Sequence, residues 1–235
     1  MTMHAPVSFG AGGGEPYARA LRTDGHLRLT DADRPDAVTT MDVGRWSAAA
    51  DRVDRSLLDD VDGGVIDIGC GPGRMLVAAR SLGIPALGVD VSAEAVAIAQ
   101  RAGGTALQGS VFDAVPDEGH WDTALVIDGN IGIGGDPTAL LARCREIVRA
   151  GGRVIVETNP EASADRVYTA RVVDADGNES AGFPWAEVGL DALHRHAAEA
   201  GLVARQSWRP RAGTSASCSP EAPTRACFAR CKTSA

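Results

Sequence analysis

The feature that most constrains the fold is a regular alternation of short apolar segments with longer amphipathic segments between residues 65 and 156. Runs of four or five apolar residues are typical of strands buried on both faces of a sheet. The predicted strands are 65–68, 86–89, 105–108, 123–127 and 153–156, and the predicted helices are about 73–82, 93–102 and 137–149. This alternation predicts an α/β fold, a Rossmann-like three-layer sandwich with a mostly parallel sheet of six to seven strands.

The flanking segments have weaker patterns. Apolar residues recur every three or four positions between residues 42 and 61, which predicts one amphipathic helix. Further expectations are a short strand at 26–29, a strand at 166–173 with a turn at 174–178, a helix at 186–200, strands at 202–208 and 226–230, and a mobile loop at 209–224.

A glycine-rich loop follows the first strand of the alternation, in the phrase VIDIGCGPG at 65–73. Glycines let a backbone turn sharply and approach a ligand closely at the start of a helix. Asp90 ends the next strand, 19 residues after Gly71. A carboxylate there can accept hydrogen bonds from both hydroxyls of a ribose, so loop and acid together predict a cofactor that contains adenosine.

The spacing of this loop bears on which cofactor it takes. A dinucleotide fingerprint has the spacing GxGxxG, whereas this loop reads GxGxG and carries Asp67 two residues before its first glycine. An acid there would repel a pyrophosphate but suits a ligand that presents an ammonium group. The Walker pattern also fails, because no Lys follows the loop.

At this point the sequence resembles the class I S-adenosylmethionine-dependent methyltransferases. The resemblance covers about residues 43–160 and is carried, in the expected order, by VIDIGCGPG (65–73), GVDVS (88–92), SVFD (110–113), ALVIDGN (124–130) and VRAGGRVIVE (148–157). The segment DGNIGIGGDP (128–137) is similar to a bacterial subgroup without assigned substrates. The resemblance implies an antiparallel last strand and a methyltransferase domain at 41–235.

Residues 1–40 contain many breakers of regular structure but also Phe9, Tyr17, Leu21, Leu27 and Leu29. These apolar side chains predict an N-terminal cap that folds over the pocket and excludes water, with a disordered leader as the alternative. A cap insertion is expected at about 160–185.

The resemblance also implies roles for individual residues. Asp67 with its loop would hold the methionine end of S-adenosylmethionine, Asp90 the ribose, and Ser110 with Val111 the adenine edge. Many relatives have an acid where Ser110 stands. The complete set of expected cofactor-binding residues is Asp67, Gly69, Cys70, Gly71, Gly73, Asp90, Val91, Ser110, Val111 and Asp128; the product would be S-adenosylhomocysteine.

Candidates for contact with the substrate lie at the carboxyl ends of the fourth and fifth strands: Asp128, Asn130, Glu157 and Asn159. Direct in-line methyl transfer needs orientation and water exclusion, with a general base only where the nucleophile has a proton to lose. Asn130 is not followed by the Pro-Pro-aromatic motif with which many amino-methyltransferases of DNA and protein bind a planar nitrogen. The absence of this motif counts against methylation of nucleobases. No metal is expected. Phe183-Pro184-Trp185 either walls a substrate pocket or packs the last helix.

The amino-acid composition limits the classes of partner and substrate that this chain is expected to bind. A net charge of −8, from 31 acidic and 23 basic residues, argues against nucleic acid. No segment has the length of a membrane span, and five cysteines, an odd number, indicate reduced thiols in a cytoplasm. An aromatic content of 4% favours close backbone contacts over an aromatic-lined binding surface. The sequence therefore predicts a methyltransferase that acts on a small molecule. The alternatives are a nicotinamide-dependent (NAD(P)) reductase and a non-catalytic module that binds the cofactor.

Overall fold

The computed structural model describes residues 9–10, 16–23, 25–208 and 225–230. These residues form two sheets, one of seven strands and one of four. Within them no helix combines the length and the apolar character needed to cross a membrane.

The seven-stranded sheet has the order β10-β11-β7-β6-β3-β4-β5. Neighbouring strands from β7 to β5 are parallel, whereas β11 lies antiparallel between β7 and β10. The Rossmann-like α/β fold and its antiparallel last strand are therefore confirmed. The strands are β3 (Val65–Ile68), β4 (Ala86–Asp90), β5 (Ala106–Gln108), β6 (Trp121–Val126), β7 (Val148–Glu157), β10 (Leu202–Trp208) and β11 (Arg225–Arg230).

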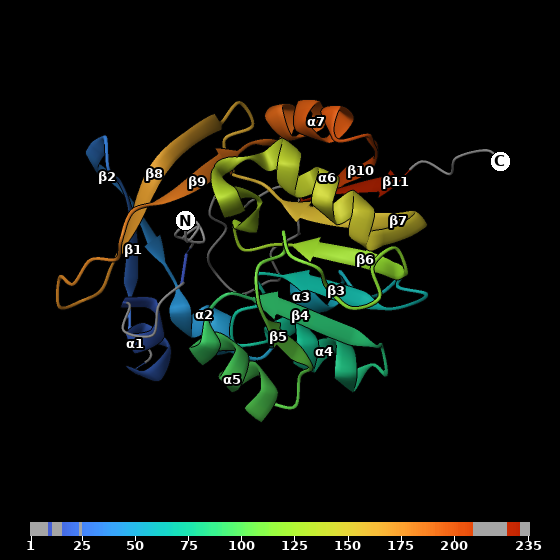
Figure 1. Cartoon of the computed structure of the whole chain (residues 1–235), viewed down its shortest axis with the longest axis horizontal. Coiled ribbons are helices and arrows are strands. Elements are labelled where there is room, and N and C mark those ends of the chain that lie inside the picture. Colours follow the sequence, from blue (N-terminus) through green and yellow to red (C-terminus); the bar gives the residue numbers. More distant parts are fainter. Residues whose placement is uncertain (1–8, 11–15, 24, 209–224, 231–235) are drawn as a thin grey trace, which may run out of the picture.

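Helices cover both faces of this sheet (Figure 1). On one face lie α4 (Arg74–Ser81) and α5 (Ala93–Arg101), and on the other lie α6 (Pro137–Ile147) and α7 (Leu190–Glu199). Two predicted helix starts are confirmed: Ser92 accepts from the Ala95 amide, and Asp136 accepts from the Ala139 amide with Pro137 in the first turn. Side-chain capping thus fixes where α5 and α6 begin at the edge of the sheet.

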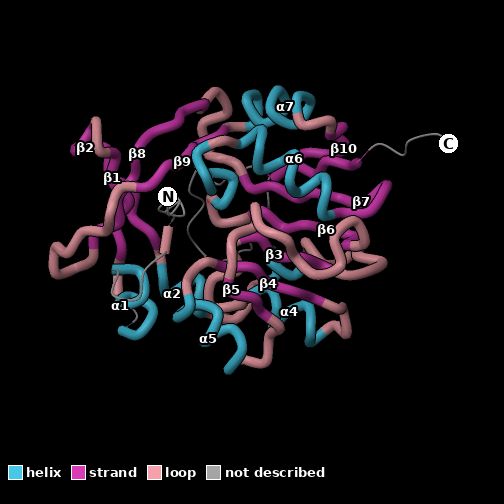
Figure 2. Tube along the Cα trace, viewed as in Figure 1, coloured by secondary structure: helices cyan, strands magenta, loops and turns pink. Residues whose placement is uncertain are grey.

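The four-stranded antiparallel sheet, here called the cap sheet, has the order β2-β1-β8-β9. It joins chain segments far apart in sequence, because β1 (Leu27–Asp31) pairs with both β2 (Arg34–Met41) and β8 (Asp165–Val173). The fourth strand, β9 (Phe183–Val188), pairs with β8. Figure 2 shows these strands together at one side of the molecule, and the arrows of Figure 1 show that β4 and β6, with β3 parallel to both, point towards that side. Helix α1 (Pro16–Thr23) packs its buried Tyr17 and Leu21 into the same apolar cluster as Leu27 and Phe183.

Two predicted helices are wrong in part. The segment 42–61 forms two short helices, α2 (Val43–Ser47) and α3 (Arg52–Arg55), because Asp51 and Asp54 accept hydrogen bonds from each other's backbone amides and start a new helix. The helix expected from residue 186 begins at Leu190, because residues 183–188 pair with β8 as β9. Strand β2 was not predicted, and the expected loop at 209–224 lies outside the described residues.

Candidate active site

The glycine loop after β3 has a backbone that only glycine adopts easily. Gly69 has a φ of +69° and Gly71 a φ of +52°. A Cβ at Gly69 would lie 2.7 Å from the Asn130 amide nitrogen. The loop therefore needs glycine both for its turn and for its close contact with the segment after β6.

Asp90, at the end of β4, holds this loop in place. One carboxylate oxygen accepts a hydrogen bond from the Gly71 amide at 2.8 Å, and the other accepts from the Ser92 amide at 2.8 Å. Burial raises the pKa of Asp90. Each oxygen keeps a second lone pair, so the carboxylate can still accept from a bound hydroxyl group.

Asp67 is a buried carboxylate, 3% exposed, with no hydrogen bond to its side chain from any described residue. Burial, reinforced by the nearby Asp128 carboxylate and partly opposed by Arg74, raises the pKa of Asp67 to about 7. A buried acid of this kind gains from a cationic partner. Arg74 acts on it only from a distance, and no described cation forms an ion pair or a hydrogen bond with it, which fits a ligand that brings an ammonium group to this place.

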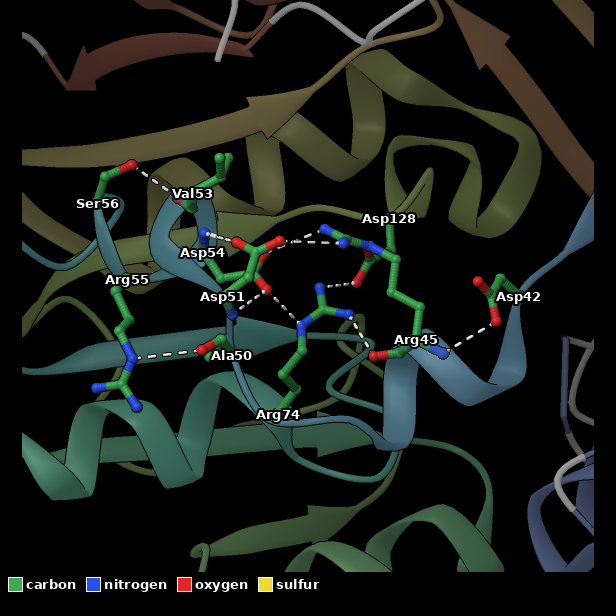
Figure 3. Close-up of polar contacts among 10 residues, drawn as sticks. All are labelled: Asp42, Arg45, Ala50, Asp51, Val53, Asp54, Arg55, Ser56, Arg74 and Asp128. Atoms are coloured by element: carbon green, nitrogen blue, oxygen red, sulfur yellow. Dashed lines mark hydrogen bonds and ion pairs between the residues drawn. The ribbon is translucent and has the colours of Figure 1, made fainter. Parts of the chain in front are cut away.

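Asp128 has an unusual backbone for a residue other than glycine, with a φ of +55°. Its side chain is held by Arg74, whose Nη2 lies 2.8 Å from an Asp128 oxygen and whose Nε lies 3.1 Å from Asp54. Arg74 and Asp54 are 4% and 1% exposed at their side chains, and Arg74 also donates to the Arg45 carbonyl (Figure 3). This buried network fixes a strained residue at the end of β6.

Asn130 braces the glycine loop from the other side. Its amide nitrogen donates to the carbonyls of Ile68 and Gly69, at 2.8 Å and 2.9 Å. Asn130 is the first residue of the short 3₁₀ segment η1 (Asn130–Gly135). Its donors are used within the protein, so Asn130 positions the loop.

These groups surround a cavity of about 680 Å³ at the carboxyl ends of β3, β4 and β6. Most residues proposed from the sequence line it, including Asp67, Cys70, Val91, Ser110 and Asn130. The exceptions are Gly73, Glu157 and Asn159. A Cβ at Gly73 would lie 2.7 Å from Ala99, so this glycine serves the packing of α4 against α5.

One expectation from composition is wrong. Although the chain is poor in aromatic residues, five of its ten line this cavity: Phe9, Tyr17, Trp46, Phe112 and Trp185. Four of the rings contact one another, with centroids 4.8 Å apart for Phe9 and Tyr17. The low aromatic content of the whole chain therefore gave no indication that aromatic residues are concentrated around this cavity. Trp185 and Pro184 form part of the cavity wall.

Arg74, Met41 and Trp46 line the cavity but were not predicted as site residues, whereas Tyr17 was expected there only as part of the N-terminal cap. Arg74 follows the glycine loop directly, but its partners Asp54 and Asp128 lie 20 positions before it and 54 positions after it, so no local pattern indicated their network. Tyr17 reaches the loop from the cap: its hydroxyl lies 3.3 Å from where a Gly71 Cβ would be. No local pattern connects it to residues 54 positions away.

Metal ligands do not gather in the part of the chain that is described: no group of three or more His, Cys, Asp and Glu side chains could hold an ion. The Cys70 thiol is buried, and burial raises its pKa strongly. Cys218 and Cys231 lie outside the described residues.

The fold and this site correspond to known proteins. The family model of the methyltransferase domain matches residues 41–211. No curated protein matches the sequence. Among solved structures, the chain is similar to an S-adenosylmethionine-dependent methyltransferase from Bacteroides fragilis in complex with S-adenosylhomocysteine, at 17% identity and a TM-score of 0.72, covering 92% of this chain and 95% of that one.

Two more distant structures share the fold. One is the 1,6-didemethyltoxoflavin-N1-methyltransferase of Burkholderia thailandensis, with 19% identity, a TM-score of 0.54 and 77% of each chain covered. The other is the CcbJ methyltransferase of Streptomyces caelestis, with 14% identity, a TM-score of 0.59, and 77% and 94% of the two chains covered. A parallel sheet with a glycine loop, an acid after the second strand and an antiparallel strand beside β7 defines the class I methyltransferase architecture. The chain belongs to the methyltransferase domain family and is an S-adenosylmethionine-dependent methyltransferase.

Proposed function

We propose that this methyltransferase transfers a methyl group to a small molecule bound under the cap sheet. The observation that carries the proposal is that the cofactor loop and the cap residues line opposite sides of one and the same cavity. A site of about 680 Å³ enclosed by two sheets has the size typical of small-ligand pockets.

The residues present fit the cofactor by their chemistry. Asp67 is a buried acid that no described side chain pairs with at contact distance, so it would pair with the ammonium group of the methionine end. Asp90 would accept the ribose hydroxyls, and Ser110 with Val111 would contact the adenine edge. Gly69 and Gly71 supply a cradle that a Cβ would fill.

When bound, S-adenosylmethionine would supply a methyl group on its sulfonium, for in-line displacement by a lone pair of the substrate with the C–S electrons returning to sulfur. The chain's own task is to orient the nucleophile and to exclude water. Asp128 and Asn130 contribute to this orientation indirectly. Asp128 is ion-paired with Arg74, and Asn130 donates hydrogen bonds to the glycine loop. We propose them as positioning residues.

Other features support a small-molecule substrate over a macromolecule. The net charge of −8 does not favour contact with phosphate backbones. The similar structure from Burkholderia thailandensis is a methyltransferase of 1,6-didemethyltoxoflavin, a small ring compound that is bound in it together with S-adenosylhomocysteine. We propose action in the cytoplasm, on the basis of the five cysteines.

The proposal is tested by following S-adenosylhomocysteine formation with two fractions of a cell extract, one that passes a dialysis membrane and one that does not. We expect methyl acceptance only in the dialysable fraction. Acceptance only in the retained fraction would overturn the small-molecule assignment. Calorimetry with S-adenosylhomocysteine and NADH in parallel separates the proposal from a reductase, which would bind NADH.

A further inference from the structure

The cap side of the cavity is built from four aromatic rings, here called the aromatic wall: Phe9, Tyr17, Trp46 and Trp185. They come from the N-terminal segment, α1, α2 and β9, and their centroids lie 4.8–6.5 Å apart where they pair. Tyr17 and Trp185 are buried, whereas Phe9 and Trp46 keep exposed surface beside the cavity. A cluster that served packing alone would have no need to leave ring surface exposed there.

The glycines of η1 are needed for this wall. A Cβ at Gly132 would lie 2.5 Å from the Trp185 ring, and a Cβ at Gly135 would lie 2.9 Å from Pro184. Neither indole nor proline could rest against a bulkier segment. The glycine-rich segment after β6, which begins with Asp128 and Asn130, therefore lets Trp185 pack directly on it, next to the cofactor loop.

Charge in the cavity is one-sided. Its described lining carries five carboxylates, Asp67, Asp90, Asp113, Asp128 and Asp136, and one basic side chain, Arg74. The Arg74 guanidinium is already engaged by Asp54 and Asp128. A carboxylate or phosphate on a substrate would meet no available cation there and would be repelled.

The described lining also lacks a base able to deprotonate a strongly basic nucleophile. It contains no His and no Lys, and the Cys70 thiol is kept protonated by burial. Asp128 is ion-paired, and Asp67 would be used by the cofactor. Carboxylates are far too weak to deprotonate an alkylammonium group, so the nucleophile has to arrive with a free lone pair.

We propose that the substrate is a planar aromatic amine or nitrogen heteroaromatic, without an anionic group and neutral at its reacting nitrogen, whose ring stacks on the aromatic wall. This inference rests on the proposed function, because the wall faces the cofactor loop across one cavity. Ring stacking holds the plane and excludes water, while the weakly basic nitrogen presents its lone pair without a general base.

The test uses the full chain saturated with S-adenosylhomocysteine and a panel of small ring compounds as probes, whose binding is measured by calorimetry. The panel contains neutral arylamines such as 6-aminoquinoline, the matched carboxylate quinoline-6-carboxylate, and the aliphatic cyclohexylamine. We expect the arylamines to bind and the other two to bind at least tenfold more weakly. With S-adenosylmethionine, mass spectrometry is expected to detect N-methylated arylamine.

Trp46→Leu and Trp185→Leu are the wall variants, and Trp121→Leu is the matched control, since Trp121 lies outside the cavity and donates to the Pro116 carbonyl. The wall variants are expected to weaken arylamine binding about tenfold while the control leaves it unchanged. If a leucine variant fails to bind S-adenosylhomocysteine, Trp46→Phe, which keeps a ring, and Phe9→Leu provide the same contrast.

Three results would overturn the inference: tighter binding of the carboxylate, equal binding of cyclohexylamine, or no arylamine binding by a protein that binds S-adenosylhomocysteine. Each of these leaves the proposed function intact. A wild-type chain that fails to bind S-adenosylhomocysteine would instead contradict the proposed function itself.

Discussion

The cofactor side and the cap side of the cavity are built in different ways. The cofactor side is made by one continuous stretch from Asp67 to Asn130, in which each strand ends beside the next. The cap side combines Phe9, Tyr17 and Trp46 with Trp185, so its most distant parts, Phe9 and Trp185, are 176 positions apart in the sequence. A local motif can encode the first side, whereas only long-range strand pairing can assemble the second.

The comparison predicts that breaking the buried network on the cofactor side has the largest effect. Arg74→Leu leaves Asp54 and Asp128 without their shared cation, which typically costs about 3–5 kcal/mol of stability. We expect the melting temperature to fall by roughly 10 °C. Arg171→Leu, which removes the exposed pair with Glu179, is the control and should cost less than about 1 kcal/mol. Equal melting temperatures for the two variants would contradict the role given to Arg74.

Asp90→Ala is expected to have the next largest effect, this time on binding. It removes the acceptor for the Gly71 and Ser92 amides and for the proposed ribose contact. The affinity for S-adenosylhomocysteine should fall about 100-fold, or about 2.7 kcal/mol, by calorimetry. The exposed Asp62→Ala is the control, and near-normal affinity in a folded Asp90→Ala protein would refute the ribose assignment.

A smaller effect is expected where the two sides meet. Gly132→Ala places a methyl group against the Trp185 ring and the Ala186 carbonyl, so the aromatic wall has to shift. Arylamine affinity is expected to fall roughly tenfold, with less than about threefold change for S-adenosylhomocysteine. The reverse order of effects would mean that η1 serves the cofactor side instead.

The pH dependence of cofactor binding sharpens the role of Asp67. Because its pKa is raised to about 7, the ionised form that pairs with a cation is scarce at pH 6. Affinity for S-adenosylhomocysteine should therefore rise about tenfold between pH 6 and pH 8. Asp67→Asn should bind weakly with a flatter profile, and an unchanged profile in this variant would rule Asp67 out.

The same residue makes an opposite prediction for stability without ligand. A carboxyl group whose folded pKa lies above its unfolded value holds more protons when folded, so stability falls as pH rises from about 4 to about 7. At pH 8, Asp67→Asn should therefore melt a few degrees above the wild type. A lower melting temperature for the variant at pH 8 would contradict the raised pKa.

The contrast between the two sides also explains what the sequence could predict. The apolar strands, the caps at Ser92 and Asp136 and the loop from Gly69 to Gly71 are local signals, and the structure contains each of them. The break after Ser47 was missed because the helical period continues across it, while a capping pair at Asp51 and Asp54 decides the backbone. Trp185 was expected either to wall the pocket or to pack the last helix, and Phe9 and Tyr17 were expected only as parts of the cap. Their assembly with Trp46 into one aromatic wall was not predicted, because composition averages over the chain and carries no information on strand pairing.

The most direct test of this account is calorimetry with S-adenosylhomocysteine on Asp90→Ala and Trp46→Leu side by side. If the cofactor site lies in the continuous stretch and the cap serves the substrate, Asp90→Ala loses about 100-fold in affinity and Trp46→Leu stays within about threefold of the wild type. Comparable losses in both variants, or a loss confined to Trp46→Leu, would contradict the division of the cavity between its two sides.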